Sequence, residues 1–169
     1  MRIPSRPRVR RAAGFSLIEL VLVVAIILII SAIAIPRFLS SKMRANETGA
    51  VSALRSFTAA QVAYQTTYQQ GVAPDLQSLG PPPPGDDPSP SRANLIDSLL
   101  ASGVRSGYVF IYTPVDINGD GTPDSYTLNA NPVSPGQTAQ KFFYVDQSNL
   151  IRFSMDGPAG PTSSPIPSG

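Results

Sequence analysis

A long, strongly apolar segment from Phe15 to Ile35 constrains this chain more than any other feature. Its 21 residues contain a single charged side chain, Glu19. A helix of this length measures roughly 30 Å, which matches the hydrocarbon core of a bilayer. The segment is longer than the apolar part of an ordinary secretory signal. It therefore predicts one membrane-spanning helix.

Basic residues precede this segment and set its expected orientation. Five arginines lie before Gly14, and basic residues beside a spanning helix favour the cytoplasmic side. We therefore expect a basic leader over 1–14 and a head outside the inner membrane. Residues 15–169 contain 8 basic and 11 acidic side chains. The basic pI of the whole chain thus owes much to the leader and does not indicate nucleic-acid binding.

Glu19 asks for an explanation, because a charge well inside hydrocarbon costs about 2.5–3.5 kcal/mol. Residues 14–20 (Gly-Phe-Ser-Leu-Ile-Glu-Leu), with the apolar run that follows as far as Pro36, resemble the processing motif of type IV prepilins and pseudopilins. The resemblance covers roughly the first third of the chain. It implies cleavage by a prepilin peptidase between Gly14 and Phe15, followed by N-methylation of Phe15.

This cleavage would place an amine one helical turn before Glu19. In a filament core of packed apolar helices, the Glu19 carboxylate would neutralise the amine of an adjacent subunit and set the register between them. Two other interpretations stay open. The segment is a plain single-pass anchor, or Glu19 lies near the membrane interface and reaches out to water.

A second helix pattern follows the apolar segment, which we assign to 15–36. Pro36 lacks an amide hydrogen and is expected to kink or locally open the helix near residue 32. Apolar residues then recur mostly every three, four or seven positions over 37–70, which predicts one amphipathic helix that packs on the head. The predicted stripe consists of Leu39, Met43, Ala50, Leu54, Phe57, Tyr64 and Tyr68.

The rest of the chain predicts a small β-rich head. Residues 71–107 form a Pro-rich loop with a short helix over 94–102, and 108–156 contain four strand-like runs. The tail, 157–169, is rich in Pro, Gly and Ser and is expected to be flexible. Together these patterns predict an α+β, pilin-like fold, in which one long N-terminal helix packs on a four-stranded antiparallel sheet.

One loop has the spacing of a calcium site. Asp116, Asn118, Asp120 and Asp124 occupy positions 1, 3, 5 and 9 of an EF-hand-like pattern. Thr122 is a further candidate ligand, but Thr127 stands where the full motif has glutamate. The other interpretation is a solvated turn, since Asn-Gly and Asp-Gly are strong turn dipeptides. A bound calcium ion would partly replace the disulfides that the chain lacks.

The absence of cysteine and histidine argues against an enzyme, because it removes the usual general base, thiol nucleophile and transition-metal ligands. We predict a structural subunit of a type IV pilus. It is inserted in the inner membrane, processed by prepilin peptidase, and assembled by pilus machinery into a helical homo-oligomer outside the cell.

A pseudopilin of a type II secretion system is the alternative. The lack of cysteine and the calcium-type loop favour it, whereas the lack of a Trp-Gly pattern does not. A monomeric membrane-anchored binding module that uses the Pro-rich loop is a third interpretation.

Overall fold

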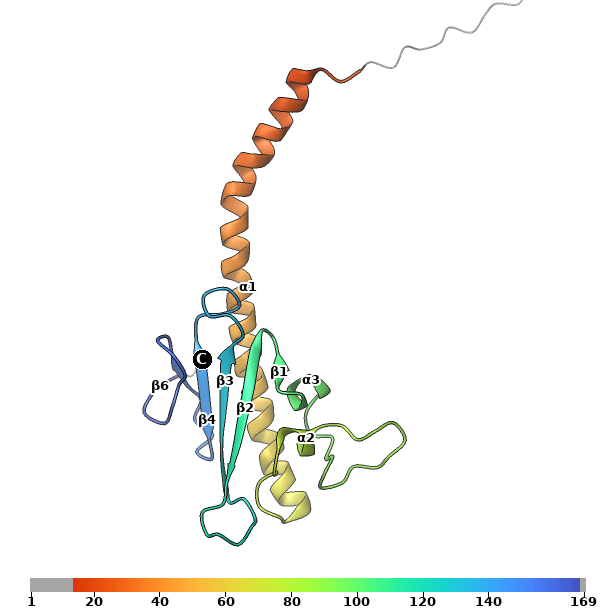
Figure 1. Ribbon diagram of the computed structural model, residues 1–169, viewed down its shortest axis with the longest axis vertical. Coiled ribbons are helices and arrows are strands. Elements are labelled where there is room, and N and C mark those ends of the chain that lie inside the picture. Colours follow the sequence, from red (N-terminus) through yellow and green to blue (C-terminus); the bar gives the residue numbers. More distant parts are fainter. Residues whose placement is uncertain (1–13, 168–169) are drawn as a thin grey trace, which may run out of the picture. The chain divides into compact units, whose positions relative to one another are not determined.

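The computed structural model describes residues 14–167 and forms two compact units, Met1–Phe38 and Leu39–Gly169. Helix α1 (Leu17–Tyr68) begins in the first unit and continues into the second (Figure 1). The predicted leader lies outside the described residues, apart from Gly14.

Helix α1 continues through Pro36, which stands inside it. The expected local opening near residue 32 is not observed. Proline removes one backbone hydrogen bond, and α1 continues from Leu17 to Tyr68 despite this loss. The helix ends at Tyr68, two residues before the predicted boundary at residue 70.

The second half of α1 buries one face. Its buried residues recur every one, three or four positions, which is the pattern of a helix packed on one side. Leu39, at the start of the predicted stripe, is instead exposed. The buried residues of α1 are Ala50, Ala53, Leu54, Phe57, Ala60, Gln61 and Tyr64.

The head contains one antiparallel sheet whose strands lie in sequence order. Four strands were predicted, and the sheet has six, because a two-residue strand pairs at each edge. The last of these lies in the segment expected to be a flexible tail, where Ile166 also packs on the core. The strands are β1 (Val104–Arg105), β2 (Tyr108–Val115), β3 (Ser125–Pro132), β4 (Phe142–Asp146), β5 (Arg152–Ser154) and β6 (Ser164–Pro165).

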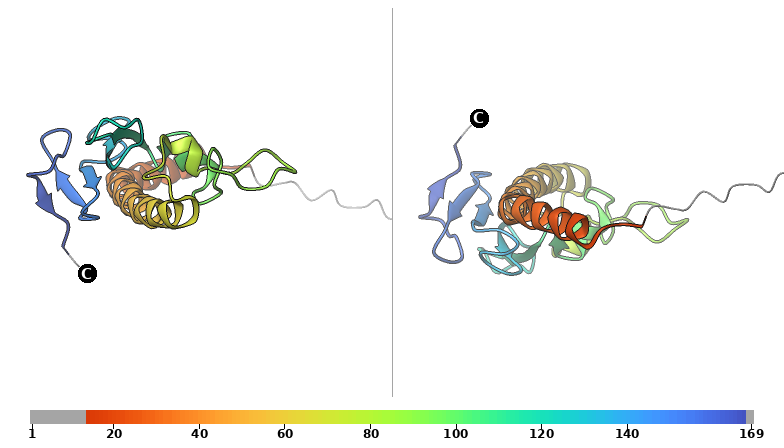
Figure 2. Two further views of the ribbon diagram at one scale, coloured as in Figure 1. Left: turned by 90° about the horizontal axis from the view of Figure 1, so that it is seen from below. Right: turned by 90° about the horizontal axis from the view of Figure 1, so that it is seen from above.

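Two short helices occupy the Pro-rich segment. Helix α2 (Leu76–Leu79) was not predicted; the Asp75 side chain caps it by accepting from Ser78 N. Helix α3 (Ser98–Ala101) is shorter than the predicted 94–102, because Asp97 caps it from within that range. Figure 2 shows this segment in green and the C-terminal strands in blue, on opposite sides of the part of α1 that follows Phe38.

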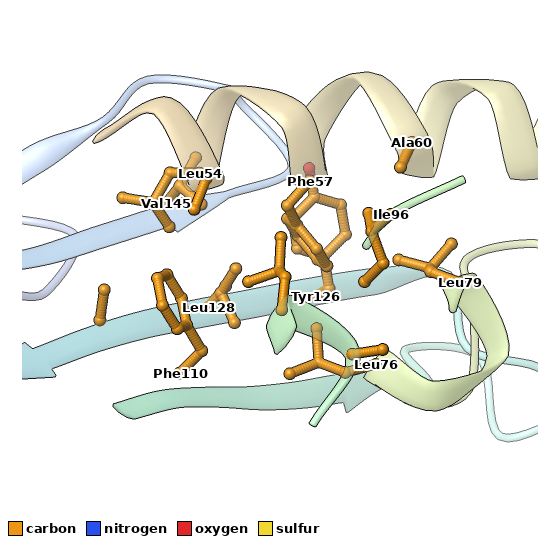
Figure 3. Packing of buried hydrophobic residues seen from close by; sticks show 14 of the residues in the cluster. Leu54, Phe57, Ala60, Leu76, Leu79, Ile96, Phe110, Tyr126, Leu128 and Val145 are labelled. Atoms are coloured by element: carbon orange, nitrogen blue, oxygen red, sulfur yellow. The ribbon is translucent and has the colours of Figure 1, made fainter. Parts of the chain in front are cut away.

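The core fills the space between α1, the sheet and α2 (Figure 3). The Phe57 ring meets the rings of Tyr112 and Tyr126 edge-on, with centroids 5.5 and 5.3 Å apart. Every residue of this buried cluster lies in the unit Leu39–Gly169. That unit therefore has a complete core, and we expect it to fold without the apolar part of α1.

Candidate assembly site

The N-terminal end of the described chain brings three of the predicted site residues close together. Gly14 and Phe15 precede α1 in non-helical backbone, and the first helical hydrogen bond runs from Leu20 N to Ser16 O at 3.2 Å. The Phe15 side chain is 82% exposed. The Gly14–Phe15 peptide bond thus lies outside the helix, in backbone without regular structure.

Glu19 lies in the first turn of α1 and is exposed. Backbone N–H groups of a first turn have no partner within the helix, so an anion is favoured there. Pro36, predicted with Glu19 to take part in assembly, lies seventeen positions further along. At the rise of an α-helix this is roughly 25 Å away, so the structure does not bring Pro36 to the other three.

The apolar part of α1 presents hydrophobic side chains on every side. Its large apolar residues from Leu17 to Ile35 range in exposure from 43% at Val23 to 80% at Leu17. A helix that is apolar all round is covered by lipid or by other helices. Its most apolar 18-residue window has a mean hydropathy of 3.1, so by length and composition α1 can cross a membrane.

The loop between β2 and β3 is closed by its own side chains. The Asp116 carboxylate accepts hydrogen bonds from Gly119 N at 2.7 Å and from Gly121 N at 2.8 Å. Hydrogen bonds from Gly121 and Gly119 lower the pKa of Asp116, because they stabilise the ionised form.

The other candidate calcium ligands behave in the same way. Asn118 Oδ1 accepts from Asp120 N, Asp120 Oδ1 accepts from Thr122 N, and Asp124 Oδ2 accepts from Ile117 N. Within residues 14–167, no three carboxylate, imidazole or thiol groups are gathered as a metal site. In this conformation the loop is a turn whose side-chain oxygens accept from its own backbone amides, and calcium binding stays a prediction.

Sequence reasoning missed three polar residues of α1 that attach the helix to the head. Asn46 Nδ2 donates to Thr138 O at 2.7 Å, and Glu47 Oε1 accepts from Gln140 N at 3.1 Å. The side chain of Gln61, on α1, is buried where the helix packs on the sheet. Its signal was present in the sequence, because position 61 falls on the buried stripe between Phe57 and Tyr64.

Comparisons with known proteins identify the same N-terminal segment. Residues 9–35 match the family described as the prokaryotic N-terminal methylation motif. The chain is also 45% identical over 56 residues to the type IV wide pilus major component PilA4 of Thermus thermophilus. That alignment covers 33% of this chain and 43% of the relative. No solved structure matches the chain significantly.

These findings confirm the resemblance to type IV pilins, which was based on the N-terminal motif. The chain carries a prepilin-type methylation motif at its N-terminus. The α+β architecture predicted for the head, with a long helix and an antiparallel sheet, is confirmed by the structure.

Proposed function

We propose that this chain is a structural subunit of a type IV pilus filament that polymerises through the apolar part of α1. The observation that carries the proposal is the exposed apolar surface of Leu17–Ile35, in which Glu19 is the one charged residue. Neither lipid nor a bundle of identical helices requires a polar face on such a helix. The role is structural packing rather than catalysis.

Processing and orientation form the second part of the proposal. A prepilin peptidase cuts between Gly14 and Phe15 on the cytoplasmic face, and the new amine of Phe15 is methylated. The methylation motif over 9–35 and the non-helical backbone before Leu17 support this step. The head, Leu39–Gly169, is then held outside the inner membrane until the subunit enters the filament.

Pairing of the Phe15 amine with the Glu19 carboxylate would select one axial register between adjacent subunits. In the filament core, the Phe15 amine of one subunit would lie beside the Glu19 carboxylate of its neighbour. An unpaired charge among packed apolar helices is costly, so registers that leave either group alone are disfavoured. The same carboxylate stands in the first turn of α1, away from the middle of the apolar segment, where a charge in a membrane costs most.

A pseudopilin of a type II secretion system is the alternative, and the exposed acidic loop between β2 and β3 is the observation that favours it. The similarity to a protein named as a pilus component favours the pilus. The two functions differ in where the polymer stands, since a pilus reaches the cell surface and a pseudopilus stays in the envelope.

Shearing cells that express the tagged chain, followed by electron microscopy of the supernatant with an antibody against residues 39–169, tests the proposal. Long labelled fibres are the expected result. A chain that fractionates only with the envelope, and forms short polymers there, would support the pseudopilin instead. A chain that stays monomeric in the membrane would contradict both filament functions and favour a binding module.

A further inference from the structure

A groove with an apolar floor and a basic rim lies beside α1 in the unit Leu39–Gly169. It encloses about 460 Å³. Val51, Phe143 and Ile166 supply apolar lining, and Arg44, Arg55 and Lys141 supply positive charge.

Over residues 14–167, the two arginines of the groove have no acidic partner. Arg44, Val51 and Arg55 are seven and four positions apart, so they share one face of α1. Glu47, the acidic side chain of the groove, is already engaged by Lys141 Nζ at 3.4 Å and by the amide of Gln140. Within the described part of the chain, neither guanidinium forms an ion pair. The groove thus offers two unpaired cations above an apolar floor.

The loop over 116–124 has the complementary chemistry. It contains three aspartates, and Ile117 stands among them with 68% of its side chain exposed. Charge is also separated along the chain, since residues 37–70 hold four basic and one acidic side chain and residues 71–169 hold four basic and nine acidic. An exposed apolar side chain flanked by carboxylates fits a groove that combines apolar lining with arginines.

The loop and the groove of one chain cannot meet. The loop lies beside the C-terminal end of α1, where Pro123 O accepts from Val72 N at 2.9 Å (Figure 1). Arg55 is thirteen residues before the last residue of α1, which is roughly 20 Å along the helix axis. The loop and the groove therefore lie at different positions along α1, so a contact between them requires two copies of the chain.

We propose that this groove binds the 116–124 loop of a second copy of the chain, placed further along the same filament. Ile117 enters the apolar part, and Asp120 and Asp124 face Arg44 and Arg55. The contact joins two different surfaces, so each bound copy leaves a free loop and a free groove, and the arrangement propagates. This inference rests on the proposed filament function and assigns the contact between its heads.

The absence of cysteine makes disulfide trapping a clean test. A full-length chain with Thr48→Cys, at the groove, and Ile117→Cys, at the loop tip, is assembled and oxidised on cells. The expected result is a ladder of covalent multimers on a non-reducing gel. The matched control pairs Thr48→Cys with Asp87→Cys, which places the second thiol in the exposed Pro-rich loop. It should give no ladder.

A charge exchange supplies an independent readout. Arg55→Glu alone and Asp120→Arg alone should each lower filament yield by about tenfold, because each places like charges across the contact. The double variant Arg55→Glu with Asp120→Arg should restore most of the yield.

The outcomes separate this inference from the proposed function. Two results overturn the groove contact and leave the filament function standing, provided that the wild-type chain forms filaments. In the first, the Thr48→Cys, Ile117→Cys variant gives no ladder. In the second, the control variant with Asp87→Cys gives an equal ladder. Binding of residues 39–169 to anionic phospholipid vesicles through Arg44 and Arg55, without a ladder, also overturns it in favour of a lipid site. If the wild-type chain forms no filaments, the filament function fails and the contact fails with it.

Discussion

Gln61 on α1 donates a hydrogen bond from Nε2 to the phenolic oxygen of Tyr112 on β2, at 3.1 Å. The same amide accepts from Ala73 N at 3.0 Å through Oε1, and the Tyr112 hydroxyl donates to Ala73 O. Gln61 is 1% exposed. One buried side chain therefore joins the helix, the segment that follows it and the sheet.

Replacing Gln61 with Met should destabilise the head. Met keeps the length and apolar contacts of the side chain but leaves the Ala73 amide without its partner, which costs about 1–3 kcal/mol. The free energy of unfolding of the fragment 39–169, measured by urea titration, should fall by that amount. Gln65→Met is the control, because Gln65 lies one turn later on the exposed face and should change stability little. Equal stability of the two variants would show that the network contributes nothing.

The buried stripe of α1 and the antiparallel sheet were predictable because they follow periods of 3.6 and 2 residues. The edge strands β1 and β6 were not, since two residues carry no periodic signal and depend on a partner strand. Gly49 illustrates a limit of propensity. Glycine disfavours helix interiors, yet a Cβ at this position would lie 2.7 Å from Ser106 Oγ, so glycine permits a close approach of helix and turn.

The functional residues also divide into those that the sequence could predict and those that it could not. Gly14, Phe15 and Glu19 are contiguous in sequence, so their proximity in the structure follows from local spacing alone. The groove of Arg44, Arg55, Phe143 and Ile166 joins residues about a hundred positions apart. Its composition depends on how β4 and the C-terminal residues pack beside α1, and no local pattern contains that information.

Alkaline pH should unfold the head. Burial raises the pKa of Tyr126 to about 12, with a smaller contribution from Asp146, and burial also raises the pKa of Tyr108 and Tyr112. Unfolded tyrosines ionise near pH 10. Because the folded pKa values are higher, the buried neutral tyrosines contribute stability that is fully present below about pH 10. This contribution is lost as the pH rises toward 12, and each pKa unit of difference corresponds to about 1.4 kcal/mol.

Thermal melts of the fragment 39–169 between pH 6 and 12 test this expectation. The chain has no histidine, so the melting temperature should stay nearly constant from about pH 6 to 9 and fall above pH 10. Tyr126→Phe should be less stable at neutral pH, because it loses the hydrogen bond to Asn149 Oδ1, but should show a shallower alkaline decline. A Tyr126→Phe profile parallel to wild type would exclude Tyr126 as a cause.

Gly14→Arg should prevent processing, because a bulky charge does not enter a site that accepts a small residue. Mass spectrometry of the membrane fraction should then find the uncut chain, whereas wild type should begin with methylated Phe15. Gly14→Ala is the control and should still be cut, since alanine is also small. An intact Met1 terminus on assembled wild-type protein would refute the cleavage itself.

Glu19→Leu should insert into the membrane as well as wild type, because it makes the segment more apolar. Filament yield should fall by at least about tenfold, since the Phe15 amine then has no partner in the filament core. Counting labelled filaments per cell measures the effect, with Ile18→Leu as the neutral control. A normal yield from Glu19→Leu would mean that this carboxylate has no role in assembly.

Calcium should raise the melting temperature of the fragment 39–169 if the 116–124 loop binds it. In the structure the carboxylates of Asp116, Asp120 and Asp124 accept from loop groups and are not gathered around a centre. Binding therefore requires them to converge, which an ion would favour by offsetting their mutual repulsion. A ligand that binds only the folded state stabilises it by about 2.7 kcal/mol at one hundred times its Kd. Magnesium should act far less, because it keeps its waters and demands a rigid octahedron.

Two aspartate variants separate the ion from the turn. Asp120→Ala should abolish the calcium effect, and in calcium-free buffer should cost little, because relief of repulsion offsets the lost bond to Thr122 N. Asp116→Ala should lower stability even without calcium, because the amides of Gly119 and Gly121 lose their acceptor.

Lowering the pH should reproduce the loss of stability expected for Asp116→Ala. The depressed pKa of Asp116 contributes stability above its unfolded value near 4, and this is lost as the pH falls through the folded value. Melting that is indifferent to calcium and chelator, with Asp116→Ala still destabilised, would leave the loop as a turn held by its own carboxylates.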